Sequence, residues 1–220
     1  MRHYWYFSSM NLLTKLRRPF RYTFSNMTLV LIGVNLLVYL LMRVDPQLGQ
    51  YLSLNPLLVI KAGMVWQVFT YQFVHGSLSH IIFNMLGLLF FGMAVERRLG
   101  SREFLLLYML SGLLCGIFSL LLYIVTSTWY VYLMGASGVV FALLLAYAVL
   151  YPRSMIYIWG IIPIPAPVLV LGYAGLEVVY MLTGTNQGVA HSTHLIGFVV
   201  CWVYFLVRFG VNPIKVWTRR

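Results

Sequence analysis

Gly135-Ala136-Ser137-Gly138 stands directly before a run of apolar residues, 139–150. The sequence therefore predicts a membrane helix that begins at Ser137. The small neighbours leave room for another backbone, or for a substrate, to approach the serine hydroxyl. The first turn of a helix offers free N–H groups that can hold a developing negative charge. Small-residue clusters are also common where membrane helices touch, so the motif alone favours helix packing over chemistry.

The composition is that of a polytopic membrane protein. Of the 220 residues, 61% are hydrophobic and only 9% are charged, whereas a soluble domain has about 25% charged residues. The net charge of +11 is also typical of nucleic-acid-binding proteins, but here the basic residues cluster beside the apolar runs. Anionic lipid and the positive-inside bias account for that distribution. We therefore expect a lipid bilayer as a partner and no nucleic acid.

Six apolar runs are predicted as transmembrane helices, which gives an all-α fold class. The predicted spans are 27–42, 79–95, 103–126, 137–150, 166–182 and 189–207. The first run has no small-residue cleavage site after it, so it is interpreted as a retained span and not as a signal peptide. The connection 43–78 is broken by proline and glycine but rich in apolar and aromatic residues, and we expect it in the membrane interface. Residues 154–165 are expected to approach the membrane in the same way.

Six spans place both termini on one side of the membrane. On that topology 13 of the 15 Lys and Arg residues lie on the side of the termini, and only Arg43 and Lys61 lie on the other. The positive-inside rule then predicts cytoplasmic termini and a multi-pass protein of the plasma membrane. Residues 1–26 and 210–220 are assigned as basic cytoplasmic flanks of a core at 27–209. An Arg-rich start without acids also fits a mitochondrial transit peptide, which is the lesser alternative.

Polar side chains lie at a matched depth on the second, fourth and sixth spans, which all run in the same direction. His80 and Asn84 open the second span, and their spacing of four places them on one helix face. Ser137 opens the fourth span and His194 lies near the start of the sixth, so all four lie within ~10 Å of the outer interface. We interpret them as one site facing the extracytoplasmic side, with Ser137 as nucleophile and His194 as general base. His80, Asn84 and the backbone N–H groups of Ser137 and Gly138 are predicted to hold the oxyanion.

The chain has four acidic residues, and they decide whether a third group can join the serine and the histidine. Asp45 lies in the outer connection, while Glu96 and Glu103 lie on the inner side, Glu96 as the charged end of a helix. Glu177 lies within the fifth span, and nothing in the sequence places it against His194, so we expect it to make a structural hydrogen bond. A Ser–His dyad is therefore predicted rather than a triad, with His194 oriented by packing.

Three further side chains near the predicted site have expected roles. Phe141 lies one turn below Ser137 on the same helix face, so its ring is expected to stack on the imidazole of His194. His75 precedes the second span and is expected to cap the connection before it through a hydrogen bond. His191 is expected to be solvated, in the outer loop or the first turn of the sixth span.

The sequence predicts no metal and no organic cofactor. Cys115 and Cys201 both lie inside apolar runs, where they are expected to pack as small residues and to form neither a disulfide nor a metal site. The zinc-protease pattern H-E-x-x-H is absent. Ser111, Gly112 and Gly116 form a stripe of small residues, which we expect to be a contact within the bundle rather than a dimer face.

From about residue 27 to residue 209 the chain resembles the rhomboid family of intramembrane serine proteases. Four blocks carry the resemblance: Trp66 to Thr70, His75 to Asn84, Gly135 to Gly138, and His194 to Gly197. The first block is weak alone, whereas the middle two are specific in combination and in order.

The resemblance implies a six-helix core with a water-filled cavity open to the outside. It implies that transmembrane segments of membrane proteins enter past the fifth helix and are cut near the outer leaflet. It also implies Ser137 as nucleophile, His194 as its partner, and an oxyanion site at His80 and Asn84. The residues assigned supporting roles are Phe141, Gly135, Gly197 and His75.

Three positions depart from the family pattern. Gln67 follows Trp66 where the family usually has arginine, so the anchoring of the first connection is expected to differ. Phe141 stands where tyrosine is frequent, and it keeps the stacking face without the hydroxyl. Cys201 replaces a glycine that usually follows Gly197 four residues later. None of the three changes removes a predicted catalytic group.

Two other functions stay open from the sequence. A catalytically inactive relative with the same fold could act as a membrane-protein chaperone or dislocation factor, although the retained polar residues speak against it. Six spans also fit a small transporter or channel, but transporter folds usually contain an internal repeat with interrupted helices, and this sequence shows no repeat.

Overall fold

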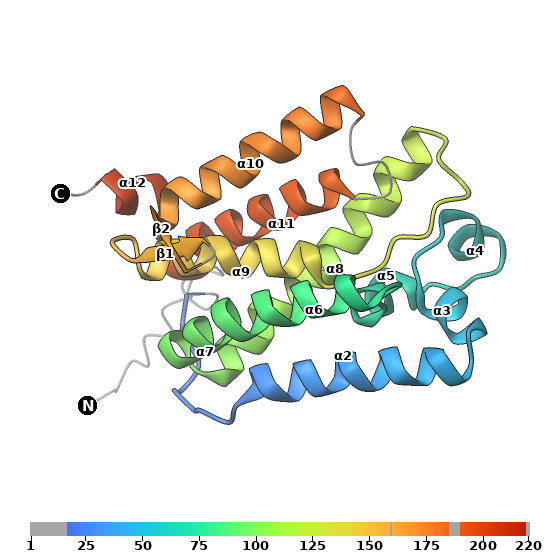
Figure 1. Cartoon of the computed structure of the whole chain (residues 1–220), viewed down its shortest axis with the longest axis horizontal. Coiled ribbons are helices and arrows are strands. Elements are labelled where there is room, and N and C mark those ends of the chain that lie inside the picture. Colours follow the sequence, from blue (N-terminus) through green and yellow to red (C-terminus); the bar gives the residue numbers. More distant parts are fainter. Residues whose placement is uncertain (1–16, 159, 185–189, 219–220) are drawn as a thin grey trace, which may run out of the picture.

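The structure, a computed structural model, describes residues 17–158, 160–184 and 190–218 and is mostly helical. Long helices lie lengthwise around a central one, α9 (Figure 1). Their bounds are α2 (Met27–Val44), α6 (Leu78–Gly87), α8 (Ser101–Val125), α9 (Ser137–Leu150), α10 (Ala166–Thr183) and α11 (His191–Tyr204). α6 continues through a π-helical turn, η2 (Leu88–Gly92), into α7 (Met93–Leu99), and α11 continues into a second one, η3 (Phe205–Phe209).

Five helical segments within the described ranges are long and apolar enough to cross a bilayer: 27–44, 78–99, 101–125, 166–183 and 191–209. They agree with five of the six predicted spans to within a few residues. The fourth predicted span is α9, which has only 14 residues and is therefore about 21 Å long, less than the ~30 Å of a bilayer core. Most residues of α9 are buried on all sides, as expected for a helix that is apolar all round.

Short helices fill the connection between α2 and α6. They are α3 (Gln47–Leu52), α4 (Pro56–Lys61), α5 (Gln67–Thr70) and the 3₁₀ turn η1 (Tyr71–Phe73). Gln67 is fully buried, accepts a hydrogen bond from the Asn55 N–H and donates to the Gln50 carbonyl. This glutamine therefore anchors the connection from the position where the family resemblance leads one to expect arginine.

The small-residue stripe on α8 is a contact within the bundle, as predicted. A Cβ atom added to Gly116 would lie 2.1 Å from the carbonyl oxygen of Val68, and one added to Gly112 would lie 2.0 Å from the Gln72 side chain. Only a residue without a side chain permits this approach of α8 to the connecting segment. The two cysteines are buried and unpaired.

Two segments differ from the sequence prediction. β1 (Met155–Ile158) and β2 (Ile162–Pro165) pair as antiparallel strands, whereas the sequence predicted an all-α chain. Pro163 and Pro165 argue against a strand, but prolines are tolerated in a two-stranded ribbon because both strands are edges. A short helix, α12 (Pro213–Thr218), follows η3. Of the predicted basic flanks, residues 1–16 and 219–220 lie outside the described ranges.

Glu96 is more than the charged end of a helix. Its carboxylate is buried and accepts hydrogen bonds from the backbone N–H groups of Met27 and Thr28 and from the hydroxyl of Ser101. An acceptor at the first turn of α2 satisfies N–H groups that the helix itself leaves free. Glu96 thus joins α7 to the start of α2.

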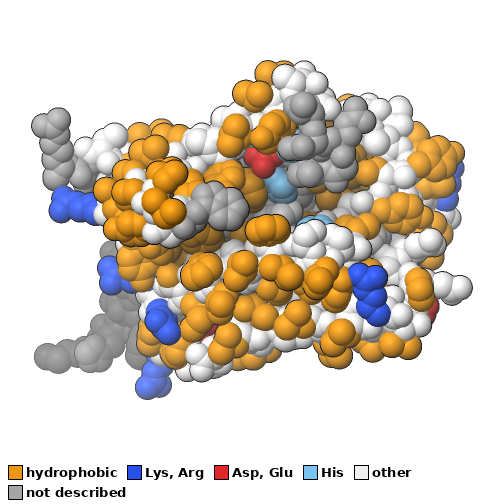
Figure 2. Space-filling model, viewed as in Figure 1, with side chains coloured by type: hydrophobic (Ala, Val, Ile, Leu, Met, Phe, Trp, Pro, Cys, Tyr) orange, Lys and Arg blue, Asp and Glu red, His pale blue; other side chains and the backbone are white. Residues whose placement is uncertain are grey.

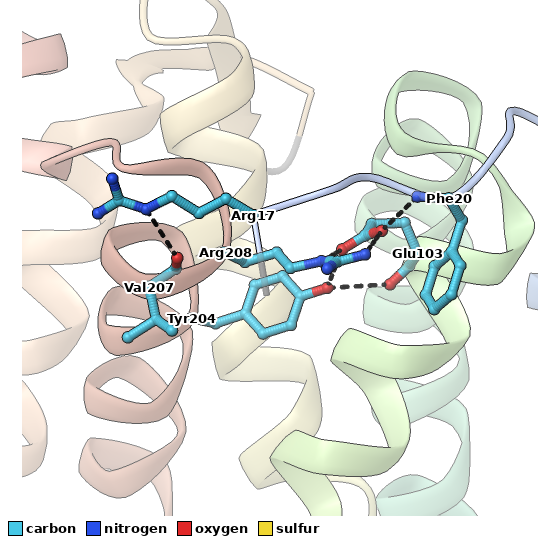
Figure 3. A network of polar contacts seen from close by, with 6 residues as sticks. All are labelled: Arg17, Phe20, Glu103, Tyr204, Val207 and Arg208. Atoms are coloured by element: carbon cyan, nitrogen blue, oxygen red, sulfur yellow. Dashed lines mark hydrogen bonds and ion pairs between the residues drawn. The ribbon is translucent and has the colours of Figure 1, made fainter. Parts of the chain in front are cut away.

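A second buried carboxylate joins α8 to η3 at the same end of the bundle (Figure 3). Glu103 pairs with Arg208 through Nε at 2.6 Å and Nη2 at 2.9 Å, and it accepts a hydrogen bond from the Tyr204 hydroxyl. The backbone N–H of Phe20 also donates to it, at 3.3 Å. Three polar partners satisfy a charge that would otherwise be costly in an apolar bundle.

Replacing Glu103 by glutamine is expected to destabilise the fold by about 3 kcal/mol. The substitution removes the charge that pairs with Arg208, and breaking a buried ion pair costs about 3–5 kcal/mol, part of which glutamine recovers because it still accepts one hydrogen bond. Thermal unfolding of the purified chain in detergent measures the effect. An unchanged unfolding midpoint would show that the pair adds nothing to stability.

The outer surface fits a bilayer. On the face shown in Figure 2, side chains between the two ends of the molecule are mostly hydrophobic, and Lys and Arg gather towards the ends. Large apolar side chains are exposed along α2, α8 and α10, for example Leu37, Phe118 and Leu171. In water such a belt would be an aggregation hazard, whereas lipid solvates it. The chain is a multi-pass membrane protein.

Candidate active site

The hydroxyl of Ser137 and the imidazole of His194 meet at one end of the bundle. Ser137 is the first residue of α9 and His194 lies in the first turn of α11. The Ser137 Oγ is 2.7 Å from the His194 Nε2, a hydrogen-bond distance. The predicted convergence of these two side chains is therefore present in the resting structure.

Two glycines allow α9 and α11 to approach so closely. A Cβ atom added to Gly197 would lie 2.1 Å from the carbonyl oxygen of Gly138, so the two helix backbones touch at this point. The contact lies one turn beyond the Ser137–His194 hydrogen bond on α11. Gly197, for which the sequence predicted a supporting role, therefore sets the separation of the two helices that carry Ser137 and His194.

The ring of Phe141 stacks on the ring of His194. Their centroids are 4.3 Å apart and the planes differ by 12°, which is the arrangement predicted from the helical spacing of Phe141 and Ser137. The stack restricts rotation of the His194 ring about its Cβ–Cγ bond. Phe141 also makes an edge contact with the ring of Tyr173 from α10.

His80 lies against the turn that precedes Ser137. Gly135 has a φ of +111°, and a Cβ atom there would lie 2.5 Å from the His80 Nε2. Glycine is needed twice over, for the backbone angle and for the space that the imidazole fills. Asn84, one turn further along α6, donates from Nδ2 to the His80 carbonyl at 2.9 Å. The structure thus brings both predicted oxyanion side chains to the end of α9 that carries the serine.

The four polar residues border one cavity of about 810 Å³. Figure 2 shows histidine and acidic side chains within a hollow on this face of the molecule. Further lining residues come from α6, from the segment before α9 and from the facing ends of α10 and α11: Ser79, Phe83, Tyr132, Met134, Tyr180 and Ser192. The volume is typical of a ligand pocket and is large enough for several residues of an extended peptide.

His75 supports the turn before α9 and lies outside the spans. It is buried, and its Nε2 accepts a long hydrogen bond, 3.5 Å, from the backbone N–H of Ala136. Burial and the neighbouring His80, whose ring is 5.0 Å away, lower the pKa of His75 from 6.5 to about 4. A neutral imidazole at physiological pH can serve as this acceptor, and the hydrogen bond supports the turn before α9, whereas the sequence predicted a cap of the connection 43–78.

The lowered pKa of His75 predicts a loss of stability in acid. Between pH 6.5 and 4 the unfolded chain binds a proton that the folded chain does not, so the contribution is complete above pH 6.5 and is lost as the pH falls towards 4. The total is about 3 kcal/mol. Thermal unfolding midpoints at pH 7.5 and 5 should therefore differ more in the wild type than in His75→Gln. Equal shifts in the two proteins would contradict the lowered pKa.

Glu177 and His191 are placed differently from the sequence predictions. The Glu177 Oε1 lies 2.9 Å from the His194 Nδ1, a hydrogen-bond distance, so the prediction that no acid lies against His194 is wrong. Its other oxygen, Oε2, is 2.5 Å from the Nδ1 of His191. His191 is also buried rather than solvated, with 9% of its surface exposed.

The antiparallel course of α10 explains this placement. Glu177 lies near the end of α10 and His194 near the start of α11, so the two residues share one level of the bundle. The matched depth in the sequence concerns only spans that run in the same direction, and the fifth span runs in the opposite one. Helix rotation, which aims Glu177 at α11 and not at lipid, is set by packing and has no simple sequence signal.

Glu177, His191 and His194 are also the described residues that could hold a metal ion. One ligand atom from each lies within 4.8 Å of the others. Both Nδ1 atoms are hydrogen-bonded directly to the carboxylate in this structure. A metal ion bound through these Nδ1 atoms would have to displace both hydrogen bonds.

Comparison with known proteins gives consistent similarities. The model of the Rhomboid domain family matches residues 62–210. The mitochondrial RHOMBOID-like protein 12 of Arabidopsis thaliana is 29% identical over 191 residues, which cover 80% of this chain and 56% of that protein. Rhomboid protease GlpG of Enterobacter sp. (strain 638) is 31% identical over 179 residues, 79% of this chain and 59% of its own length. The chain thus spans a little over half the length of these two curated relatives.

Proposed function

The chain belongs to the rhomboid family, and on that premise we propose that it is an intramembrane serine endopeptidase acting on the transmembrane segments of membrane proteins. The observation that carries the proposal is the 2.7 Å contact between the Ser137 Oγ and the His194 Nε2 at the edge of a cavity. A serine with a hydrogen-bonded base is the recurring arrangement of acyl-transfer enzymes.

In the proposed first half-reaction the Ser137 Oγ attacks the carbonyl carbon of the scissile peptide bond. The new C–O bond forms as the hydroxyl proton passes to the His194 Nε2, and the carbonyl π electrons move to the oxygen. When the tetrahedral intermediate collapses, the C–N bond breaks and His194 returns the proton to the leaving amine. The result is an ester between the substrate and Ser137.

Water completes the reaction in the second half. A water molecule attacks the ester carbonyl while His194 accepts its proton, and collapse expels the Ser137 oxygen, which recovers that proton. The products are a carboxylic acid and the free enzyme. The cavity of about 810 Å³ supports this step because it gives water room beside Ser137.

We assign the oxyanion site to groups around the start of α9. The side chains of His80 and Asn84 border the same cavity as Ser137. The backbone N–H groups of Ser137 and Gly138 belong to the first turn of a helix, where they have no partner within the helix. Donors fixed in advance around a developing charge are the largest contribution to catalysis in many such enzymes.

The proposed topology has six spans with cytoplasmic termini in the plasma membrane, α9 being the short central span. The cavity then opens to the extracytoplasmic side, and cleavage takes place near the outer leaflet. The charge distribution of the sequence supports this orientation. We assign 27–209 as the catalytic core and residues 1–26 and 210–220 as basic flanks.

Proteolysis in a bilayer tests the proposal. The purified full chain is reconstituted into liposomes with a single-span membrane protein whose transmembrane segment carries helix-destabilising residues near its outer end. The wild type is expected to cut the substrate, and Ser137→Ala is expected not to. If the wild type leaves the substrate intact but prevents its aggregation, the protein is the chaperone-like relative; unchanged cleavage by Ser137→Ala removes the serine from the reaction.

A further inference from the structure

The carboxylate of Glu177 lies on the far side of the His194 ring from Ser137. The His194 Nε2 is 2.7 Å from the Ser137 Oγ, and its Nδ1 is 2.9 Å from the Glu177 Oε1. Serine, imidazole and carboxylate therefore form one continuous hydrogen-bonded chain across three helices, α9, α11 and α10. His194 and Glu177 are both more than nine-tenths buried.

We propose that Glu177 is the positioning residue of a Ser137–His194–Glu177 triad, an inference that rests on the proposed protease function. An ionised carboxylate can only accept hydrogen bonds. It therefore requires the proton of neutral His194 to be on Nδ1, which leaves the lone pair of Nε2 directed at the serine hydroxyl. When His194 takes up the serine proton, the adjacent negative charge stabilises the imidazolium that forms.

His191 holds the carboxylate in this orientation. His191 and His194 are three residues apart and lie on one face of α11, and each Nδ1 contacts a different oxygen of Glu177. One oxygen is thus occupied by His191 while the other is aimed at His194. The ring of Tyr180 packs against His191, with 5.4 Å between the ring centroids. The carboxylate therefore has little freedom to turn away from His194.

The face of α10 that carries Glu177 packs against the residues around Ser137 and His194. Tyr173, Glu177 and Tyr180 lie at intervals of four and three residues and so share one helix face. Tyr173 contacts Phe141, and Glu177 and Tyr180 contact the histidines of α11. Neighbouring residues on the other faces of α10, such as Leu176 and Val179, are exposed, as lipid-facing residues are.

The same molecule contains a second buried carboxylate, Glu103, whose contacts are purely structural. Glu103 also has two side-chain partners, Arg208 and Tyr204 (Figure 3). It lies at the start of α8, at the opposite end of the bundle from the start of α9 (Figure 1). Both carboxylates satisfy the rule that a charge in a membrane helix needs a partner. Only the partner of Glu177 is also in contact with the nucleophile. The two sites therefore provide a matched pair for an experiment.

The test compares Glu177→Gln with Glu103→Gln in the full chain, reconstituted with the single-span substrate described above. Glutamine preserves the size of the side chain and can still accept one hydrogen bond, but it carries no charge. Glu177→Gln is expected to lower kcat by about 10²- to 10⁴-fold, with KM within about threefold of the wild-type value because substrate binding does not use Glu177. The rate at which a fluorophosphonate labels Ser137 should fall with kcat.

Conservative replacement and the control complete the comparison. Glu177→Asp keeps the charge on a shorter side chain and is expected to recover part of the lost kcat. Glu103→Gln is expected to lower the unfolding temperature while leaving kcat per folded molecule close to the wild-type value. If Glu177→Gln keeps kcat within about threefold of the wild type, or loses activity only in proportion to its folded fraction, Glu177 is structural and the serine and histidine act as a dyad.

Two further results separate the possible failures. If Ser137→Ala cleaves the substrate as the wild type does, the protease proposal itself fails, whatever Glu177 does. If Glu177→Gln does not fold, the tautomer of His194 in the wild type decides the question. Nuclear magnetic resonance of ¹⁵N-histidine-labelled protein is expected to show the proton of neutral His194 on Nδ1, at low field. A proton on Nε2 instead would overturn the proposal.

Discussion

Alanine at Ser137, at His194 or at both positions is expected to reduce kcat for cleavage by about the same factor, about 10⁴- to 10⁶-fold. The two side chains act as one unit, because the serine is activated only by transfer of its proton to the His194 Nε2, 2.7 Å away. Once either is missing, removal of the other costs little more. Rates are measured in liposomes with the single-span substrate, under conditions where the unfolding temperatures show all three variants to be folded.

The double variant provides the control for this prediction. If the effects of Ser137→Ala and His194→Ala multiply, the two groups act independently and the contact between them is not part of the mechanism. If His194→Ala keeps most of the wild-type kcat, another group serves as the base. Any residual cleavage in the double variant must arise from the oxyanion site and from substrate binding.

Valine at Gly197 is expected to be the most disruptive single change in the packing of the bundle. A Cβ atom there would lie 2.1 Å from the Gly138 carbonyl oxygen, and a backbone atom cannot move aside as the end of a flexible side chain can. α9 and α11 must separate, which we expect to destabilise the fold by about 5 kcal/mol. The same separation draws His194 away from Ser137, so cleavage should be lost in the molecules that remain folded.

Gly33→Val is the matched control for this change. Gly33 lies in the middle of α2, and a Cβ atom added there meets nothing within 4 Å. Its substitution should therefore leave both the unfolding temperature and kcat close to the wild-type values. If Gly197→Val is as stable and as active as Gly33→Val, the close approach of α9 and α11 does not determine the geometry of the site.

Most of the site could be predicted from the sequence, because the depth of a residue in the membrane follows from the number of residues between it and the start of its span. His80, Asn84, Ser137 and His194 each lie a few residues from the start of a span that runs in the same direction. At about 1.5 Å per residue, they must reach one level, and the structure places them around one cavity. The stacking of Phe141 on His194 followed from helical periodicity in the same way.

The level of Glu177, the proposed third member of the site, also follows from counting residues along the spans. Glu177 lies five residues before the predicted end of the fifth span at 182, and His194 lies five residues after the predicted start of the sixth at 189. Because the two spans are antiparallel, equal counts from these facing ends place the two residues at one level. The direction in which the Glu177 side chain points does not follow from counting, because helix rotation depends on packing over the whole bundle.

Long-range polar pairs are less predictable from the sequence. Glu103 and Arg208 are separated by 105 positions, and Glu96 reaches the start of α2 from the end of α7. Basic residues are plentiful at this end of the molecule, so composition alone does not select the partner of an acid. The pairing of β1 and β2 could not be predicted either, because the prolines of β2 disfavour a strand everywhere except at the edge of a sheet.

Identification of the residue modified by a fluorophosphonate tests the proposed reaction centre most directly. The full-length protein in liposomes is treated with the reagent, digested and analysed by mass spectrometry. We expect one phosphonylated residue, Ser137, in the wild type, and labelling slowed strongly in His194→Ala. A wild-type protein that is folded yet carries no label at Ser137, or that is labelled as fast without His194, would contradict the proposed chemistry.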